Sequence, residues 1–502
     1  MVIYIHACLM KKGIVFGTLL EKAQMIQLCL LLSRIFGDNE QTGIQMKEQK
    51  KRQSYEKKSK CLILVADFYS INKYVSKVII VVERRNPISV MEAVMRVMKF
   101  AKEGKKEEVS IYECNGRFLC EDIVANHDVP SFDRSAYDGF AIRSVDLKGA
   151  SKEKPITLSV IDEIGAGQVC QKRIGEYEAV RIMTGAMLPS DCDAVVMFEV
   201  VKEDRENDQP YIIIDHEVEK GTNLSFQGED VKKGKVLVEK GTKINPGIMA
   251  LLATFGYEKV PVAKKPIIGI FATGTELLEV DEPLEKGKIR NSNAYMIMAQ
   301  IERAGAIPVY FGKLQDVFTV SYEAMKEKLE SVDILITTGG VSVGDYDLLP
   351  AIYKELGAEV LFNKVAMRPG SVTTVAHLDG KLLYGLSGNP SACYVGFEIF
   401  TKPIIRRYLF SSKPHLQSAP AILEEDFLTA NAFTRFFRST VSWKEDGLHT
   451  VPSGVDKSNI VTSLAFANAL TILPSNSTGY QKGERVNVLL LEEEEGSEWP
   501  WN

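Results

Sequence analysis

Between Pro266 and Tyr408, short apolar runs alternate with helical patterns, and this alternation constrains the fold more than any other part of the sequence. Strands that alternate with helices are typical of a largely parallel, doubly wound α/β sheet with helices on both faces. The expected strands are residues 267–272, 307–311, 334–338 and 359–362, followed by a hairpin over 372–386. The expected helices are residues 294–304, 320–330, 348–356 and 391–408.

A glycine turn, Gly339-Gly340, directly follows the apolar strand that ends at Thr338. Ligands of such folds bind beyond the carboxyl ends of strands. Glycine lets backbone N–H groups point at an anion without an intervening side chain. The carboxylates of Asp345 and Asp347 could hold a cation that bridges phosphate oxygens. Asp347 is equally suited to cap the helix that follows. The candidate ligand-binding residues are Gly339, Gly340, Ser342, Gly344, Asp345 and Asp347.

A second turn, Leu386-Ser-Gly-Asn-Pro390, joins another strand to a helix. Asn389 as N-cap and Pro390 at the first helical position explain two of its residues without a ligand. Ser387 and Gly388 have no such explanation, and the free amides of a helix N-terminus attract anions. The turn is therefore predicted to cap the helix and to bind an anion at the same time.

Upstream, the polar segment 130–141 carries Asp133 and Asp138 between apolar residues. Asp138-Gly139 alone would favour a hairpin turn. Further along, Gly228-Glu-Asp230 and Thr184-Gly185-Ala186 lie in a stretch that is expected to form short strands, including 156–161, 194–200 and 211–214.

From about Arg85 to Leu491, the order of these motifs resembles that of the molybdopterin molybdenumtransferase family and of the E domain of gephyrin. The resemblance implies a homodimeric transferase that converts adenylated molybdopterin and molybdate to molybdenum cofactor and AMP, with Mg²⁺ as the cofactor. It implies active-site roles for Asp133, Asp138, Thr184 and Glu229, with Asp138 and Glu229 reaching the pterin site across the dimer.

The sequence departs from the family pattern at three places. Thr275 stands where many members carry aspartate or asparagine, Asn291 stands where many carry aspartate, and Arg368 stands where some carry lysine. Arg368 keeps a positive charge for phosphate or molybdate. Neutral oxygens can also bind a cation, so the candidate metal ligands are Glu229, Asp345, Thr275 and Asn291.

Composition excludes several classes of function. The net charge is −5 and no long basic stripe is present, so nucleic acid is not expected as a partner. No apolar run reaches the roughly 18 residues of a membrane span. The eight cysteines form no Cys-x-x-Cys pair, which favours a reducing, cytoplasmic location over disulfides or zinc.

The chain is expected to be an elongated multidomain α/β and β protein. Residues 1–82 lack periodicity and are expected to be a poorly ordered extension or to lie upstream of the true start of translation. The capping box of Ser89 and Glu92 starts a helix that Gly104 ends, and Asn245-Pro246 starts another. The expected domains are 1–82, the extension; 83–265, helical and β-rich subdomains; 266–410, the α/β molybdopterin-binding module; 411–491, a small β domain; and 492–502, an acidic tail.

Two other functions also fit parts of the sequence. A non-catalytic scaffold of the gephyrin type could discard Asp138 and Glu229, but this chain has both residues. A nucleotide pyrophosphatase that shares the α/β module would have that module at its N-terminus, whereas here it begins near residue 266.

Overall fold

The structure is a computed structural model, and it describes residues 62–65, 78–81, 86–340, 348–491, 496 and 498–501. The chain divides into two units, Met1–Glu83 and Arg84–Asn502. In the first unit, strands β1 (Leu62–Val65) and β2 (Val78–Val81) pair in antiparallel fashion. Most of the predicted extension and the acidic run 492–495 lie outside the described residues.

Helix α4 (Val90–Met98) begins where the sequence predicted, because the Ser89 side chain accepts a hydrogen bond from the backbone N–H of Glu92. The Glu92 carboxylate pairs with Arg96 rather than with the Ser89 N–H, so half of the capping box forms. The helix ends several residues before Gly104. That glycine instead allows close packing, because its N–H donates to the Tyr408 carbonyl and a Cβ atom would lie 2.2 Å from the Tyr408 ring.

The chain then builds a small subdomain from segments on either side of a long insertion. Its members are β3 (Lys106–Ser110) paired with β14 (Lys259–Ala263), β4 (Ile123–Val124) paired with β13 (Val236–Val238), and helix α5 (Pro246–Thr254). The Asn245 side chain accepts from the Ile248 N–H and caps α5, as the sequence predicted. Both strand pairs thereby bring the two ends of the insertion back together.

The insertion is a six-stranded sheet with the order β10-β11-β7-β8-β6-β9. Phe140 and Ile142 enter one apolar cluster and Ala141, between them, enters another, so both faces of β6 are buried. The strands are β6 (Gly139–Ile142), β7 (Ile156–Ile164), β8 (Glu178–Ile182), β9 (Ala194–Met197), β10 (Lys202–Glu206) and β11 (Gln209–Ile214); beside them, β5 (Arg134–Ser135) pairs with β12 (Leu224–Ser225).

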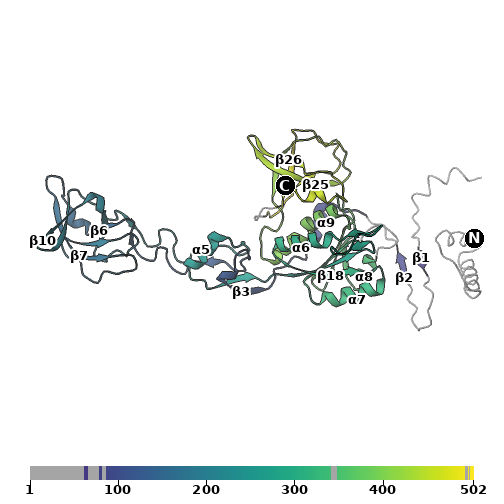
Figure 1. Cartoon of the computed structure of the whole chain (residues 1–502), viewed down its shortest axis with the longest axis horizontal. Helices are drawn as coiled ribbons and strands as arrows, with labels where there is room; N and C mark the ends of the chain where they lie inside the picture. Colours follow the sequence, from purple (N-terminus) through teal and green to yellow (C-terminus); the bar gives the residue numbers. More distant parts are fainter. Residues whose placement is uncertain are drawn as a thin grey trace, which may run out of the picture. The chain divides into compact units, whose positions relative to one another are not determined.

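The predicted α/β module is present, with the strand order β18-β15-β19-β23-β22-β20 and four parallel strands from β18 to β23 (Figure 1). Its strands are β15 (Ile267–Thr273), β18 (Ile307–Leu314), β19 (Ile334–Thr338), β20 (Glu359–Phe362), β22 (Thr374–Leu378) and β23 (Lys381–Leu386), with the short pair β16 (Leu277–Leu278) and β17 (Ile289–Arg290) alongside. Its helices are α6 (Asn293–Ala304), α7 (Phe318–Leu329), α8 (Leu349–Glu355), α9 (Pro390–Gly396) and α10 (Lys402–Tyr408).

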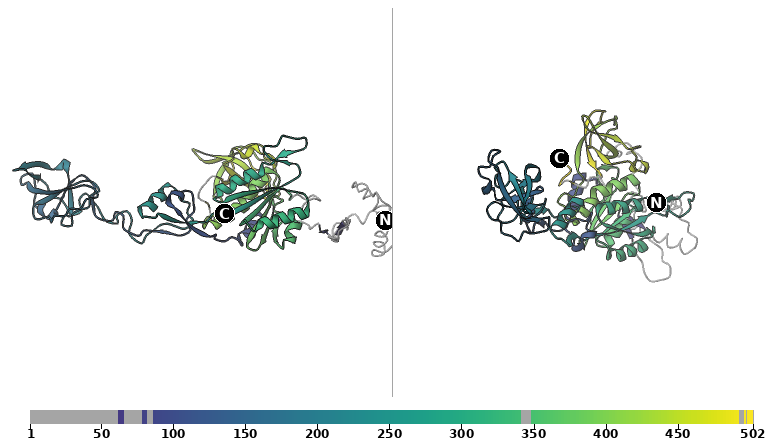
Figure 2. Two further views of the ribbon diagram at one scale, coloured as in Figure 1. Left: turned by 60° about the horizontal axis from the view of Figure 1, so that its bottom comes forward. Right: turned by 60° about the vertical axis from the view of Figure 1, so that its left-hand side comes forward.

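Helices cover both faces of this sheet, as Figure 2 shows from a second direction. One apolar cluster contains buried residues of α4, α6, α9 and α10, and a separate cluster contains those of α7 and α8. The fold is therefore doubly wound, as expected.

The sequence predicted one continuous helix over residues 391–408, and this was wrong in detail. A π-helical turn, η4 (Phe397–Thr401), separates α9 from α10. Pro403 has no N–H to offer the carbonyl four residues earlier, and a wider turn accommodates that loss. Within the turn, the buried Glu398 accepts hydrogen bonds from Gln300 at 2.8 Å and from Lys402 at 3.0 Å, which ties α6 to α10.

The C-terminal domain is a small closed barrel of five strands, in agreement with the predicted β domain. They are β24 (Ser418–Leu423), β25 (Thr434–Lys444), β26 (Gly447–Pro452), β27 (Ala469–Leu473) and β28 (Arg485–Leu490). A strand of the α/β module, β21 (Met367–Arg368), adds to this sheet beside β25. In the part of the chain that the structure describes, no helix is long and apolar enough to span a membrane.

Candidate functional site

Three loops of the β-rich insertion bond to one another and carry the predicted acidic residues. The Ser135 N–H donates to the Ala186 carbonyl at 3.0 Å, and the Gly185 N–H donates back to the Ser135 carbonyl at 2.9 Å. Pairing of β5 with β12 joins the same segment to the loop that leads to Glu229. These contacts place the four predicted catalytic residues on neighbouring loops.

Asp138 is exposed and is held by the Thr184 loop. One carboxylate oxygen, Oδ1, accepts hydrogen bonds from the backbone N–H of Thr184 at 2.7 Å and from its hydroxyl at 2.9 Å. The two bonds, the backbone one first, and the nearby Arg181 lower the pKa of Asp138 below its ordinary value. Asp138 is therefore an ionised hydrogen-bond acceptor near neutral pH.

Gly139 begins strand β6 rather than closing a hairpin turn. A Cβ atom at Gly139 would lie 2.1 Å from the carbonyl oxygen of Val196 on the adjacent strand β9. The close approach of two strands requires the glycine, so the hairpin turn that the Asp138-Gly139 pair alone would favour does not form.

Asp133 and Glu229 both shape the turn that contains Gly228. The Asp133 carboxylate accepts from the Gln227 N–H at 2.7 Å, and the Glu229 carboxylate accepts from the Phe226 N–H at 3.1 Å. Gly228 has a positive φ of 70°, which favours glycine. Glu229 itself is exposed, so its carboxylate is accessible to a ligand.

In the α/β module, the carboxyl ends of three strands converge. The Gly339 N–H at the end of β19 donates to the Leu386 carbonyl at the end of β23, at 3.0 Å. A Cβ atom at Gly339 would lie 2.5 Å from the Thr273 carbonyl oxygen at the end of β15, and one at Gly388 would lie 3.4 Å from the Gly339 Cα. Both predicted glycine turns therefore meet at one edge of the sheet, and a side chain is excluded at Gly339.

Asn293, at the start of α6, joins the two glycine turns, and the sequence did not single it out. Its Nδ2 donates to the Gly388 carbonyl at 2.9 Å and to the Thr338 hydroxyl at 3.2 Å. The side chain is buried, with 7% of its surface exposed, and its Oδ1 has no hydrogen-bond partner among the described residues. The sequence could have indicated this role, because Asn293 lies at the start of a predicted helix close to the carboxyl ends of the strands.

The expectation of free amides at the start of α9 is wrong for Ser391. Its N–H donates to the Ser458 carbonyl at 3.1 Å, and its hydroxyl donates to the Ile460 carbonyl at 2.7 Å. Asn389 occupies the N-cap position but makes no side-chain capping bond; its own N–H donates to the Ser387 hydroxyl at 3.2 Å. A loop of the C-terminal domain therefore satisfies this helix end, and Pro390 takes the first helical position as predicted.

Arg368 is exposed on a segment that lies beside α9. Close to it in the chain, a Cβ atom at Gly370 would lie 3.3 Å from the Ala392 carbonyl oxygen. The segment that carries Arg368 therefore approaches the helix that follows the Ser387–Asn389 turn, and the role of Arg368 as an anion ligand stays a prediction.

The predicted metal ligands that the structure describes either hydrogen-bond to other residues or do not gather in one place. Asn291 has only 1% of its surface exposed; its Nδ2 donates to the Tyr310 hydroxyl at 2.8 Å and its Oδ1 accepts from the Ala294 N–H at 3.2 Å. Thr275 is exposed, and its carbonyl accepts from Lys288. Across residues 86–340 and 348–491, no three His, Cys, Asp or Glu side chains gather to hold a metal ion. Ser342, Gly344, Asp345 and Asp347 lie outside the described residues.

Three family models match consecutive parts of the chain. Residues 88–256 match the MoeA N-terminal region (domain I and II), residues 269–407 match the probable molybdopterin binding domain, and residues 420–491 match the MoeA C-terminal region (domain IV). Together these models span the β-rich insertion, the α/β module and the C-terminal barrel.

Individual proteins match over nearly their whole length. The chain is 57% identical over 420 residues to a molybdopterin molybdenumtransferase of Bacillus subtilis (strain 168), covering 84% of this chain and 98% of the relative. It is 49% identical over 418 residues to one of Staphylococcus aureus (strain COL), covering 83% and 99%. A crystal structure of the molybdopterin biosynthesis moeA protein from Pyrococcus horikoshii OT3 matches with a TM-score of 0.68 and 32% identity, covering 81% of this chain and 100% of that one.

Proposed function

Because the chain belongs to the molybdopterin molybdenumtransferase family, enzymes of molybdenum cofactor biosynthesis, we propose that it inserts molybdate into adenylated molybdopterin and releases AMP. The observation that carries the proposal is the convergence of the two glycine turns at the edge of the α/β sheet. The acidic loops of the β-rich insertion, contributed by a second copy of the chain, would supply the carboxylates that the reaction requires.

The glycine turns are the proposed binding site of the pterin phosphate. Backbone N–H groups in such turns bind phosphate oxygens when no side chain blocks the approach, and a Cβ atom at Gly339 has no room here. The Ser387 hydroxyl and the Arg368 guanidinium would add a donor and a positive charge.

Asp138 and Glu229 are the proposed catalytic carboxylates. When AMP leaves, the oxygen of a water molecule attacks one phosphorus of the anhydride, the bond from that phosphorus to the bridging oxygen breaks, and the bridging oxygen stays with the other phosphate. When molybdate binds the two dithiolene sulfurs, one of its oxygens leaves as water with the two thiol protons. Asp138, kept ionised by Thr184, can accept the proton that the attacking water molecule loses. Glu229 would orient the same water molecule or the molybdate.

The family resemblance also brings Mg²⁺ to this reaction. The described side chains of one chain do not gather a set of carboxylates that fits a resident cation, and Asn291 is already bonded on both sides. No step is therefore assigned to the ion. We further propose a cytoplasmic homodimer, in which the second copy places its Asp138 loop against the pterin site.

A scaffold without catalysis is the second candidate. The presence of both Asp138 and Glu229, each exposed, favours the enzyme, because a scaffold could discard these carboxylates.

The test is incubation of the purified protein with adenylated molybdopterin, Mg²⁺ and molybdate, with AMP measured by chromatography. The expected result is AMP release that depends on molybdate, together with transfer of activity to a molybdenum-dependent apoenzyme. Tight binding of the pterin without any AMP release would favour the scaffold instead.

A further inference from the structure

We propose that Asp456, in the C-terminal domain, is a positioning residue of the pterin-phosphate site. It would set the spacing between Arg368 and the Ser387–Asn389 turn, the two segments that we expect to bind the phosphate. The inference rests on the proposed function and extends it to a residue far from both segments in sequence.

The first segment is supported by strand β25. Met367 and Arg368 form β21, which pairs in parallel with Thr434 and Arg435 of β25. The Thr434 N–H also donates to the Ala366 carbonyl at 3.2 Å. The backbone of Arg368 therefore moves with the beginning of β25.

The second segment is supported by the loop of residues 455–463. This loop accepts both hydrogen bonds of Ser391, through the Ser458 and Ile460 carbonyls. Ser391 lies in the first turn of α9, directly after Ser387–Pro390. The position of the glycine turn therefore depends on the position of this loop.

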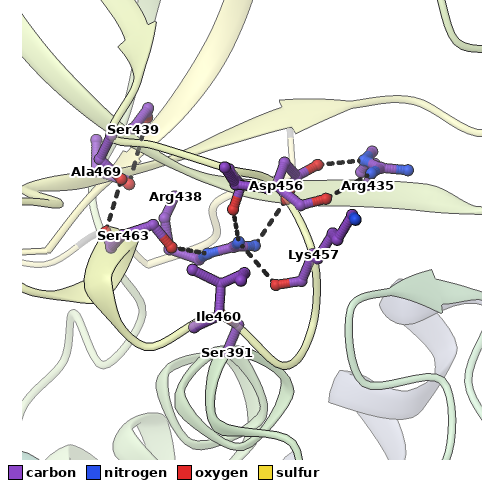
Figure 3. Close-up of polar contacts among 11 residues, drawn as sticks. Ser391, Arg435, Arg438, Ser439, Asp456, Lys457, Ile460, Ser463 and Ala469 are labelled. Carbon is purple, nitrogen blue, oxygen red and sulfur yellow. Dashed lines mark hydrogen bonds and ion pairs between the residues drawn. The ribbon is translucent and has the colours of Figure 1, made fainter.

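Asp456 joins the two supports (Figure 3). Its Oδ2 accepts from the Arg435 Nε at 2.7 Å, and its Oδ1 accepts from the Arg438 Nη1 at 2.8 Å. Arg438 has 2% of its surface exposed and donates further to the Lys457 carbonyl at 3.2 Å and to the Ser463 hydroxyl at 3.3 Å. The Asp456 carboxylate thus provides the shortest bonds between the loop and β25, and the same two arginines also donate to the loop carbonyls of Val455, Asp456 and Lys457.

The connection that Asp456 makes between the 455–463 loop and β25 affects the spacing of the two segments that we expect to bind the phosphate. The 367–370 segment already approaches α9 closely, since a Cβ atom at Gly370 would be 3.3 Å from the Ala392 carbonyl oxygen. The groups of a binding site must be held to within about 0.5 Å of the productive geometry, and in catalysis a misplacement of roughly 1 Å can lower the rate by about two orders of magnitude. Charge-assisted bonds from a largely buried arginine pair are a stiff connection of the required kind.

The experiment compares Asp456→Asn with Glu424→Gln. The amide at position 456 keeps one acceptor oxygen but turns an NH₂ group toward the second arginine. One hydrogen bond between the loop and β25 is therefore lost, while the side-chain volume stays the same. Glu424 is a matched control in the same barrel: its carboxylate pairs with Lys444 and, at 3.1 Å, with His449, and these partners lie on β25 and β26. Equilibrium binding is measured with molybdopterin and with its dephosphorylated form, well below the melting temperature of each variant.

The expected result is at least a tenfold weaker affinity of Asp456→Asn for molybdopterin, with less than a twofold change for the dephosphorylated form. Glu424→Gln should bind both as the wild type does. An unchanged affinity of Asp456→Asn for molybdopterin overturns the inference, and so does an equal loss for both probes, because a general loosening would not distinguish the phosphate.

Ser391→Ala is the second variant if Asp456→Asn does not fold. It removes one bond between α9 and the loop, and we expect at least threefold weaker binding of molybdopterin; no change overturns the inference. A wild-type protein that does not bind molybdopterin overturns the proposed function as well. Tight wild-type binding that neither variant weakens overturns only the role of Asp456.

Discussion

Replacing Asn293 with alanine should weaken molybdopterin binding far more than it weakens the fold. The Asn293 amide joins the two glycine turns by donating to the Gly388 carbonyl and the Thr338 hydroxyl. Without it, the two turns would keep the Gly339 N–H bond to the Leu386 carbonyl but lose their side-chain connection.

The effect on stability is the difference between two opposing contributions. Losing two hydrogen bonds destabilises the fold by roughly 0.5–1.5 kcal/mol each. The substitution also removes the buried Oδ1, which has no partner among the described residues and whose desolvation costs about 1–3 kcal/mol. The net change in the free energy of unfolding should therefore be no more than about 1 kcal/mol, because the two contributions nearly cancel, whereas displaced turns should weaken binding about tenfold, or about 1.4 kcal/mol.

The matched control is Asn245→Ala, which removes the cap of α5 and should also cost about 1 kcal/mol. Denaturant unfolding gives the stability of each variant, and fluorescence titration gives its affinity for molybdopterin. The reasoning is refuted if Asn293→Ala and Asn245→Ala bind molybdopterin equally well.

Three further outcomes are expected. Glu229→Gln should retain pterin binding, because the amide oxygen can still accept from the adjacent turn, but should release AMP at least about tenfold more slowly than the exposed control Glu239→Gln; equal rates would remove Glu229 from the mechanism. Thr184→Val should raise the pKa of Asp138 by deleting one of its donors, so the acid limb of kcat/KM should move to higher pH; an unmoved limb would show that another group controls it. Burial and a neighbouring arginine lower the pKa of His415 to about 4, below the value of 6.5 in the unfolded chain. The contribution of neutral His415 to stability is therefore fully present above pH 6.5 and is lost as the pH falls toward 4, by about 3 kcal/mol at most. His415→Gln should flatten the dependence of the melting temperature on pH in that window, and a curve unchanged from the wild type would contradict the assignment.

The strands and helices of the α/β module were largely predictable because their apolar periodicity is local. Strand β20 has the predicted bounds, and β15 and β19 differ by at most one residue. The interruption at η4 was missed because it depends on Pro403 within an otherwise apolar helical pattern. Local patterns predict where a helix exists better than they predict its internal irregularities.

The candidate site was predictable where glycine and strand ends coincide, and unpredictable where distant segments meet. Gly339 and Gly388 do converge, as the sequence indicated. The occupation of the Ser391 amide by the Ser458 carbonyl was not foreseen, because no local pattern reports a contact between two domains. For the same reason Asn291 suggested a ligand, whereas its burial against Tyr310 is a tertiary feature.

The shared strand β21 has a consequence for how this protein can be divided or recombined. Met367 and Arg368 belong to the α/β module by sequence and to the barrel sheet by hydrogen bonding. A fragment that stops near residue 410 would leave their backbone groups unpaired, and the barrel alone would expose the start of β25 as an open edge, which invites association with other chains. The two domains are thus expected to stay together in evolution. A chimera that exchanges the C-terminal barrel between relatives should take residues 367–368 from the same protein as the barrel.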